Sequence, residues 1–292
     1  MENQSRLLLI DGHGMAYRAF YAIRSLTTSA GQPTNALYGF IRMTQQLARY
    51  WVPTHAAAVF DGGVPEERLA LLATYKAQRE PMPDALHDQF PLIEEFLRYT
   101  GTPAVREDRQ EADDVMATLA DRARAKRAEV LLATSDKDLF QCVEGRVSII
   151  PPTKSEVRMD ADAVREKTGV DPGQIAEWLA LIGDSADNIP GVPGVGAKTA
   201  ARLLNEFGSV AALYERIDEV PNKKLREALQ AHRESVLRNV KMTRLRRELP
   251  LQVEWQEWKT RTPDIERLRD FYRRMEFNSM ANELESPTLF GD

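Results

Sequence analysis

The feature that most constrains the fold is an alternation of short apolar runs with amphipathic segments across the first 150 residues. The apolar runs predict strands at 7–10, 56–60, 129–134 and 147–150, with a weaker one at 102–105. Helical periodicity between them predicts helices at 36–50, 85–99 and 112–127. Strands separated by helices favour an α/β fold with a mainly parallel central sheet flanked by helices.

The pattern changes at about residue 171, where it becomes helical with Gly/Pro turns at 190–196 and at Gly208. A chain of 292 residues is long enough for one large domain or two smaller ones. We therefore expect a core over residues 1–170, a helical subdomain over 171–285, and a tail at 286–292.

Composition narrows the class of protein. Cys142 is the single cysteine, which excludes an internal disulfide and a cysteine-based zinc site and favours a reducing compartment. The opening MENQSR lacks the features of a secretion signal, and no apolar run approaches the roughly 20 residues that cross a bilayer. We expect a soluble, cytoplasmic protein with no membrane partner.

Aspartates follow three of the predicted strands: Asp11, Asp61 and Asp136. Ligands of open parallel sheets bind beyond the carboxyl ends of the strands, so these side chains should share one crevice. A single aspartate after a strand commonly caps the next helix. Three of them, with further acids nearby, are harder to explain as caps.

The further acids lie in short clusters. They are Asp138 in SDKD, Glu111, Asp113 and Asp114 in QEADD, and Asp184 and Asp187 in GDSAD. Acids at a helix N-terminus also stabilise the helix dipole, which is the simpler explanation of QEADD. Nine carboxylates in one crevice would repel one another strongly, and two Mg²⁺ ions, or Mn²⁺ as a substitute, would relieve that repulsion.

Two features predict a polyanionic partner despite the net charge of −5. Gly194 and Gly196 precede a predicted helix that begins with Lys198 and Thr199 in its first turn, an arrangement typical of phosphate binding. Residues 222–247 hold nine Lys/Arg and two Glu. Metals beside a phosphate-binding turn indicate hydrolysis of a phosphodiester by a two-metal mechanism, as in a nuclease.

The motifs LLLIDG, AVFDG, YKAQR, EADD, TSDKDLFQ and GDSADNIPGVPGVGAKTA run in the order found in the 5′-nucleases. The chain resembles flap endonucleases and, most closely, the 5′→3′ exonuclease domain of bacterial DNA polymerase I. The resemblance implies a sheet-based core, a helical arch at about 62–100, and a helix-three-turn-helix module. It also implies a monomer that cuts 5′ flaps and nicked or branched duplexes during replication and repair and leaves 5′-phosphates.

Matching the motifs residue by residue implies a set of roles. The metal ligands would be Asp11, Asp61, Glu111, Asp113, Asp114, Asp136, Asp138, Asp184 and Asp187. Lys76 and Arg79 would hold the scissile phosphate in the arch, and would act in catalysis together with Asp11, Asp61, Asp136 and Asp138. Gly194, Gly196, Lys198 and Thr199 would grip the duplex backbone, and carbonyl oxygens of residues 191–196 could hold K⁺.

Other residues carry weaker expectations. Tyr17 is a candidate for stacking on an unpaired base, although aromatic residues at helical spacing are more often core. Arg18 and Arg42 are candidate phosphate contacts, and we interpret His13 as a loop residue. Leu289 and Phe290 in the tail could dock in the apolar pocket of a sliding clamp, or could pack on the protein's own surface.

Two alternatives to a nuclease were considered. A haloacid-type phosphatase needs a second aspartate two residues after the first, where this chain has His13. The second alternative, a structure-specific DNA-binding protein with an inactive site, is not excluded by the sequence. The complete set of acids counts against it, because lost catalysis would leave little reason to keep so much repulsion.

Overall fold

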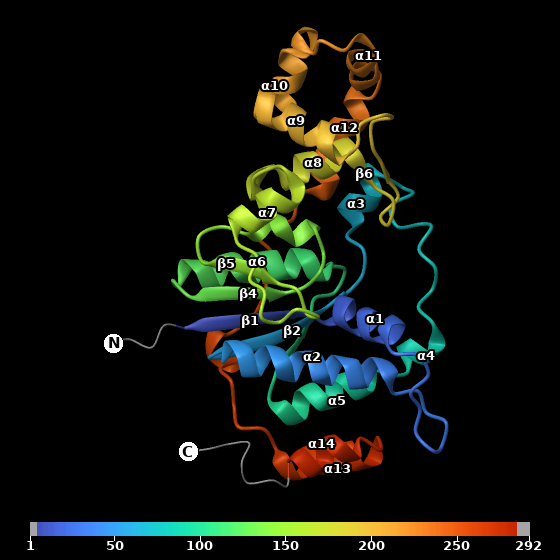
Figure 1. Cartoon of the computed structure of the whole chain (residues 1–292), viewed down its shortest axis with the longest axis vertical. Helices are drawn as coiled ribbons and strands as arrows, with labels where there is room; N and C mark the ends of the chain where they lie inside the picture. Colours follow the sequence, from blue (N-terminus) through green and yellow to red (C-terminus); the bar gives the residue numbers. More distant parts are fainter. Residues whose placement is uncertain (1–4, 285–292) are drawn as a thin grey trace.

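A computed structural model describes residues 5–284 and has an α/β core built on a five-stranded parallel sheet (Figure 1). The strands are β1 (Arg6–Asp11), β2 (His55–Phe60), β3 (Ala104–Arg106), β4 (Glu129–Ala133) and β5 (Val147–Ile150). Their order is β3-β2-β1-β4-β5. All five predicted strands are present, and the predicted fold class is confirmed.

The sheet has its topological switch point between β1 and β4. The chain adds β2 and β3 on one side of β1, then crosses to add β4 and β5 on the other. Strands β1, β2 and β4 are almost wholly buried because both sheet faces are covered, which is why they read as continuous apolar runs. Crevices at such a point collect ligands beyond the strand ends.

Helices cover both faces of the sheet. One face carries α1 (Gly12–Ala22), α2 (Asn35–Trp51), α4 (Asp84–His87) and α5 (Phe90–Thr100), and the other carries α6 (Ala112–Ala125), with η1 (Asp138–Cys142) and α7 (Ala161–Thr168) nearby. The predicted helix at 85–99 is divided into α4 and α5. Pro91 lies in the first turn of α5, where its missing N–H is tolerated, and it could not continue a helix begun at Asp84.

The predicted arch is only partly helical. The connection between β2 and α4 contains α3 (Glu66–Leu71), followed by consecutive turns at 73–78. Residues 90–100, expected within the arch, form α5, whose Ile93, Phe96 and Leu97 are buried under the sheet. An amphipathic helix with this much apolar surface belongs in the core, so the arch segment ends before it.

A second, helical part stands beyond α6 (Figure 1). It comprises η2 (Pro172–Gln174), α8 (Ile175–Ile182), the hairpin β6 (Gly183–Asp184) and β7 (Ile189–Pro190), α9 (Ala197–Phe207), α10 (Val210–Glu215), η3 (Ile217–Glu219), α11 (Lys223–Ala231) and α12 (Arg233–Thr243). Its apolar side chains join those of α6 and one sheet face in a continuous core. The two parts are therefore packed together.

The chain then returns to the sheet, which differs from the predicted helical subdomain over 171–285. After α12 it passes through η4 (Trp255–Trp258) to α13 (Ile265–Arg274) and α14 (Asn278–Glu283), which pack over α5 on the opposite face (Figure 1). Leu268, Phe271 and Tyr272 are buried there. An apolar helix face needs a partner, and the α5 side of the core supplies one.

Two expectations concern the ends of the chain and membranes. Within residues 5–284, no helix has the length and apolar character needed to span a bilayer. The tail, with Leu289 and Phe290, lies outside the described residues.

Candidate active site

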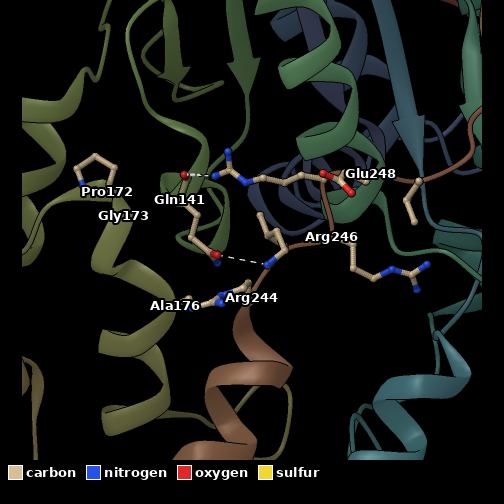
Figure 2. A pocket seen from close by; sticks show the side chains of 10 residues that line it. Gln141, Pro172, Gly173, Ala176, Arg244, Arg246 and Glu248 are labelled. Carbon is tan, nitrogen blue, oxygen red and sulfur yellow. Dashed lines mark hydrogen bonds between the residues drawn. The ribbon is translucent and has the colours of Figure 1, made fainter. Parts of the chain in front are cut away.

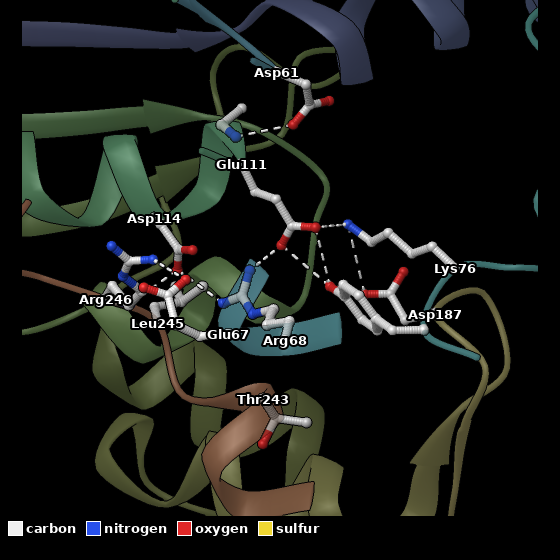
Figure 3. A network of polar contacts seen from close by, with 12 residues as sticks. Asp61, Glu67, Arg68, Lys76, Glu111, Asp114, Asp187, Thr243, Leu245 and Arg246 are labelled. Atoms are coloured by element: carbon white, nitrogen blue, oxygen red, sulfur yellow. Dashed lines mark hydrogen bonds and ion pairs between the residues drawn. The ribbon is translucent and has the colours of Figure 1, made fainter. Parts of the chain in front are cut away.

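The strand-end aspartates are held by short hydrogen bonds at the switch point. Asp11 ends β1 and caps α1, accepting a bond from the Gly14 backbone N–H at 2.7 Å and another from the Thr134 hydroxyl at 2.9 Å. Asp61 follows β2 and accepts the Ala112 N–H at 2.9 Å (Figure 3). The ends of β1 and β2 and the start of α6 therefore meet.

The hairpin β6–β7 brings acids from the helical part to the same place. Oxygens of Asp138, Asp184 and Asp187 lie within 4.8 Å of one another. A cavity of about 300 Å³ opens here. Its lining includes Lys76, Arg79, Asp113, Asp136, Lys137, Asp138, Asp184 and Asp187.

Burial and mutual repulsion perturb the acids of this site. Burial raises the pKa of Asp11 to about 6, with further contributions from Asp136 and Asp61. The pKa values of Asp113, Asp136 and Asp138 are also raised, first by burial and then by neighbouring carboxylates. Ionising all of them together is costly unless a cation is present.

The donor set fits divalent cations. Asp138 Oδ1 is buried without a hydrogen-bond partner among the described residues, and it belongs to the group whose oxygens converge within 4.8 Å. Carboxylate oxygens alone suit a hard ion such as Mg²⁺ or Mn²⁺. The cavity acids could therefore hold metal through Asp113, Asp136, Asp138, Asp184 and Asp187.

The side chains of Lys76 and Arg79, in the predicted arch segment, reach into the acids. Lys76 Nζ lies 2.5 Å from Glu111 Oε1, and Arg79 Nη2 lies 2.6 Å from Asp187 Oδ1. The arch backbone also docks on the hairpin, because Lys76 N–H donates to the Asp187 carbonyl at 3.1 Å. Arch, hairpin and acids form one connected site.

Asp114, predicted from the sequence as a metal ligand, does not line that cavity. Its side chain is fully buried, and its Oδ1 accepts from Arg68 Nη2 at 2.9 Å and from the Arg246 N–H at 2.9 Å (Figure 3). Successive residues of a helix point about 100° apart, so Asp113 and Asp114 face different neighbours.

Glu111 lies at the edge of the acid group. Its carboxylate contacts Arg68, the Tyr75 hydroxyl at 3.1 Å and Lys76. It is thus surrounded by arch residues, where the sequence predicted a metal ligand.

The candidate base-stacking residue lies beside the acids. Tyr17 and Tyr21 line a cavity of about 800 Å³ together with Asp61 and Arg79. The two rings stack with centroids 6.4 Å apart, and Tyr21 is 67% exposed. Arg18 lines a neighbouring hollow with Asp11 and Asp136.

The structure also places His13 and Arg42, two residues with weaker expectations. His13 lies in the first turn of α1, not in a loop, and its Nδ1 accepts the Asp61 N–H at 3.0 Å. Helix α1 begins directly after β1, which leaves no loop. Arg42 lies on α2, 3.8 Å from Glu283 of α14, among the helices that cover one sheet face. The role of Arg42 as a phosphate contact stays a prediction.

The glycine turn has the geometry expected of a phosphate site. Gly194 has φ +80°, a conformation that favours glycine, and Gly196 is the N-cap of α9 with no side-chain cap. Lys198 is exposed and Thr199 half-buried in the first turn. Backbone N–H groups at this helix start are available to an anion.

Part of the basic run 222–247 serves the fold itself. Arg247 donates to the Gln141 carbonyl and lies 3.3 Å from Asp121, and Leu245 N–H donates to Gln141 Oε1 at 3.3 Å (Figure 2). Arg246 lies 3.3 Å from Glu67. The residues after α12 are thus anchored to the core. Fewer side chains of the run are therefore available to a polyanion than its composition indicated.

Sequence reasoning missed four residues of the site. These are Arg68, Tyr75, Thr134 and Lys137, whose Nζ lies 3.2 Å from Asp184. Tyr75 lies in the motif YKAQR, and Thr134 and Lys137 lie in TSDKDLFQ, so their positions next to predicted site residues could have identified them. Arg68 precedes Lys76 by eight residues in a charged segment and carried no such signal.

Family models cover most of the chain. The 5′-3′ exonuclease N-terminal resolvase-like domain matches residues 6–169, and the 5′-3′ exonuclease C-terminal SAM fold matches residues 170–266. The second match agrees with the predicted helix-three-turn-helix module.

Named relatives are similar along nearly all of the chain. It is 38% identical over 288 residues to the DNA polymerase I of Bacillus caldotenax, covering 98% of this chain and 33% of that protein. It is 37% identical over 279 residues to a 5′-3′ exonuclease of Aquifex aeolicus, covering 96% of this chain and 95% of that protein. The chain spans about a third of the length of the polymerase relatives.

Solved structures share the fold. T5 5′-exonuclease with bound zinc ions has a TM-score of 0.67 at 24% identity, covering 93% of this chain and 98% of that one. The catalytic core of Rad2 in complex with a DNA substrate has a TM-score of 0.66 at 19% identity, covering 99% and 93%.

Proposed function

Because the chain belongs to the 5′-3′ exonuclease family, we propose that it is a Mg²⁺-dependent, structure-specific 5′-nuclease that hydrolyses DNA phosphodiesters and leaves 5′-phosphate ends. The observation that carries this proposal is the acid-lined cavity into which Lys76 and Arg79 extend from the arch. Mn²⁺ would substitute for Mg²⁺, since both take oxygen ligands.

Each part of the site has a task in this reaction. Two divalent ions, when bound, would supply Lewis-acid chemistry and activation of water. Asp113, Asp136, Asp138, Asp184 and Asp187 would hold the ions from the cavity, and Asp11 and Asp61 from the strand ends. Lys76 and Arg79 orient the scissile phosphate and offset the charge that develops on it.

The substrate proposed is DNA with a 5′ flap, or a nicked or branched duplex. Gly194, Gly196, Lys198 and Thr199 would contact the duplex backbone, since a helix N-terminus with a nearby lysine attracts phosphate. Tyr17 would stack on an unpaired base in the cavity beside Asp61. The structurally similar catalytic core of Rad2 was solved in complex with a DNA substrate, which supports DNA as the substrate.

The test is incubation of the protein with an end-labelled 5′-flap duplex, first with Mg²⁺ and then with excess EDTA. Cleavage near the junction of single and double strand that requires the metal is expected. Undiminished cleavage in EDTA, or no cleavage of any 5′-ended DNA, would contradict the proposal. Tight flap binding without cleavage would favour the alternative, a structure-specific DNA-binding protein with an inactive site.

Further partners and settings are proposed on weaker support. Carbonyl oxygens of residues 191–196 would hold K⁺, and the protein would act as a cytoplasmic monomer in replication and repair, in keeping with its polymerase relatives. The tail would dock on a sliding clamp through Leu289 and Phe290, gaining effective concentration at replication junctions. Equal clamp affinity of the full chain and of a chain truncated after Glu285 would rule this out.

A further inference from the structure

Arg68 joins the base of the arch to helix α6. It lies on α3, and its side chain is 6% exposed although it carries a full charge. The guanidinium contacts Glu111 and lies 2.9 Å from Asp114 Oδ1 (Figure 3). A buried charge persists only when it is paired and hydrogen-bonded, so these two carboxylates hold Arg68 in place.

Asp114 makes two contacts within the fold through Oδ1, while its Oδ2 is buried without a hydrogen-bond partner among the described residues. Besides Arg68, its Oδ1 accepts the backbone N–H of Arg246, which belongs to the segment that follows α12. Asp114 does not line the acid cavity, and it is absent from the carboxylates that converge within 4.8 Å. One carboxylate thus connects α6, the arch and the end of the duplex-binding helices.

Contacts continue from Arg68 to the reacting end of the arch. Glu111, which Arg68 contacts, lies 2.5 Å from Lys76 Nζ. The Tyr75 hydroxyl lies 3.1 Å from Glu111 Oε2 and 3.0 Å from Asp187 Oδ2 and can donate its one proton to either, and its ring packs with Ile189 of the hairpin. The placement of Lys76 therefore depends on a chain of buried contacts that begins at Arg68 and Asp114.

From this arrangement we propose that Arg68 and Asp114 form a positioning pair, which fixes the arch base on α6 and thereby holds Lys76 over the acid cavity. Asp114 acts as the counter-ion of Arg68 and not as a metal ligand. The kinetic part of this inference rests on the proposed nuclease function. The parts of the inference that concern Mn²⁺ binding and proteolysis do not depend on that function.

The first experiment compares two neighbouring, isosteric variants, Asp114→Asn and Asp113→Asn. Mn²⁺ binding is measured by titration calorimetry in the absence of DNA. Asp113→Asn is expected to weaken Mn²⁺ binding at least tenfold, while Asp114→Asn changes it less than twofold. An equal loss in both variants would make Asp114 a ligand and overturn the proposal.

The second experiment measures arch mobility without activity. Limited trypsin digestion can cut at Lys76 and Arg79, and cutting at the exposed turn of Lys126 and Arg127 serves as the internal standard. In metal-free protein, Asp114→Asn and Arg68→Gln are expected to increase the arch-to-standard cutting ratio at least fivefold. Arg68→Lys, which keeps the charge, should restore part of the protection and also covers the case in which Arg68→Gln fails to fold. An unchanged ratio in folded variants would refute the proposal.

Kinetics supply the third readout. On a 5′-flap duplex, both variants should lower kcat at least tenfold with KM within threefold, because the duplex contacts are untouched. The double variant Arg68→Gln/Asp114→Asn should lose no more than the worse single variant, since the two residues act as one unit. If the losses in kcat of the two single variants added up in the double variant, Arg68 and Asp114 would act independently, which would contradict the proposal. If the wild type itself shows no cleavage, the nuclease proposal fails while the calorimetry and digestion still decide this one.

Discussion

At the scale of single residues, adjacent side chains in this protein carry different tasks. Asp113 faces the other carboxylates, and its pKa is raised by burial and by Asp136, Asp11, Asp138 and Asp61. Asp114, the next residue, faces an arginine and a backbone amide. A motif such as EADD therefore identifies a region of acids, and only the helical rotation decides which of them meet.

The pKa of Asp11 gives a first prediction, for metal-free protein. Because burial raises this pKa from 3.8 to about 6, the native state binds more protons than the unfolded chain between these values, and its stability falls as pH rises through them. Asp11→Asn keeps a capping side chain and removes the charge. Its stability relative to wild type should rise between pH 4.5 and 7, by up to about 3 kcal/mol. Urea unfolding in EDTA measures this, and a pH-independent difference would contradict it.

The acids of the cavity give a second prediction. Asp138→Ala should reduce turnover at least a thousandfold and leave flap-duplex affinity within tenfold, because the proposed role of this carboxylate is metal binding, while the proposed DNA contacts lie in the glycine turn and the basic helices. Single-turnover cleavage and fluorescence anisotropy measure the two quantities. A folded variant that loses duplex affinity more than tenfold would show that the division is wrong. Asp108→Ala, on an exposed turn, is the control.

At the scale of elements, the short hairpin of the two-residue strands β6 and β7 connects the helical part of the molecule to the acid cavity. They turn the chain so that Asp184 and Asp187 reach the ends of the sheet strands, and they receive the arch backbone at Lys76. Helix α9 follows the glycine turn with its first N–H groups uncapped by side chains. One short stretch thus contributes to both the proposed metal site and the proposed phosphate site.

Lys198 in the first turn of α9 gives a third prediction. Lys198→Ala should weaken binding to every duplex sequence alike and lower the slope of log affinity against log salt by about one unit, as for one lost phosphate contact. Binding of two unrelated duplexes at several salt concentrations measures this. Lys126→Ala, exposed in the turn after α6 and outside the basic run 222–247, provides a matched basic control. A loss confined to one sequence would indicate base reading instead.

Much of this element structure could be predicted, and the exceptions have physical causes. Apolar runs predicted all five strands. The signal is clear for β1, β2 and β4, which are buried on both faces and therefore almost wholly apolar, and weaker for β3, which is exposed at both ends. The break between α4 and α5 depended on Pro91, which the apolar periodicity of 85–99 concealed. Arg68 and the return of α13 could not be predicted, because they depend on contacts between residues far apart in sequence.

At the scale of the whole molecule, one chain covers both faces of its sheet with segments from both ends. The helical part shares a core with α6, and α13 and α14 close the opposite face over α5. The site lies at the strand ends, away from that second layer. Stability and catalysis should therefore be separable there.

Phe271 in α13 gives a fourth prediction. Its side chain is 2% exposed, so Phe271→Ala should lower the free energy of unfolding by about 3–5 kcal/mol. Cleavage per folded molecule should stay within twofold of wild type at low temperature. Denaturant unfolding and a flap-cleavage assay check the two parts, with Tyr50→Ala, 55% exposed, as the control. A large loss of activity in the folded variant would connect this layer to the site.

The distribution of the carboxylates along the chain has a consequence for synthesis in the cell. The acids that line the cavity lie between Asp113 and Asp187 in the sequence. Lys76 and Arg79, which also line it, come from the segment before them. A nascent chain that has emerged only as far as β5 has the sheet but lacks the hairpin with Asp184 and Asp187. Under the proposed nuclease function, hydrolytic capacity should therefore appear late, after the ribosome has released the residues proposed to contact the duplex. An unfinished chain should then be unable to cut DNA that it cannot yet select.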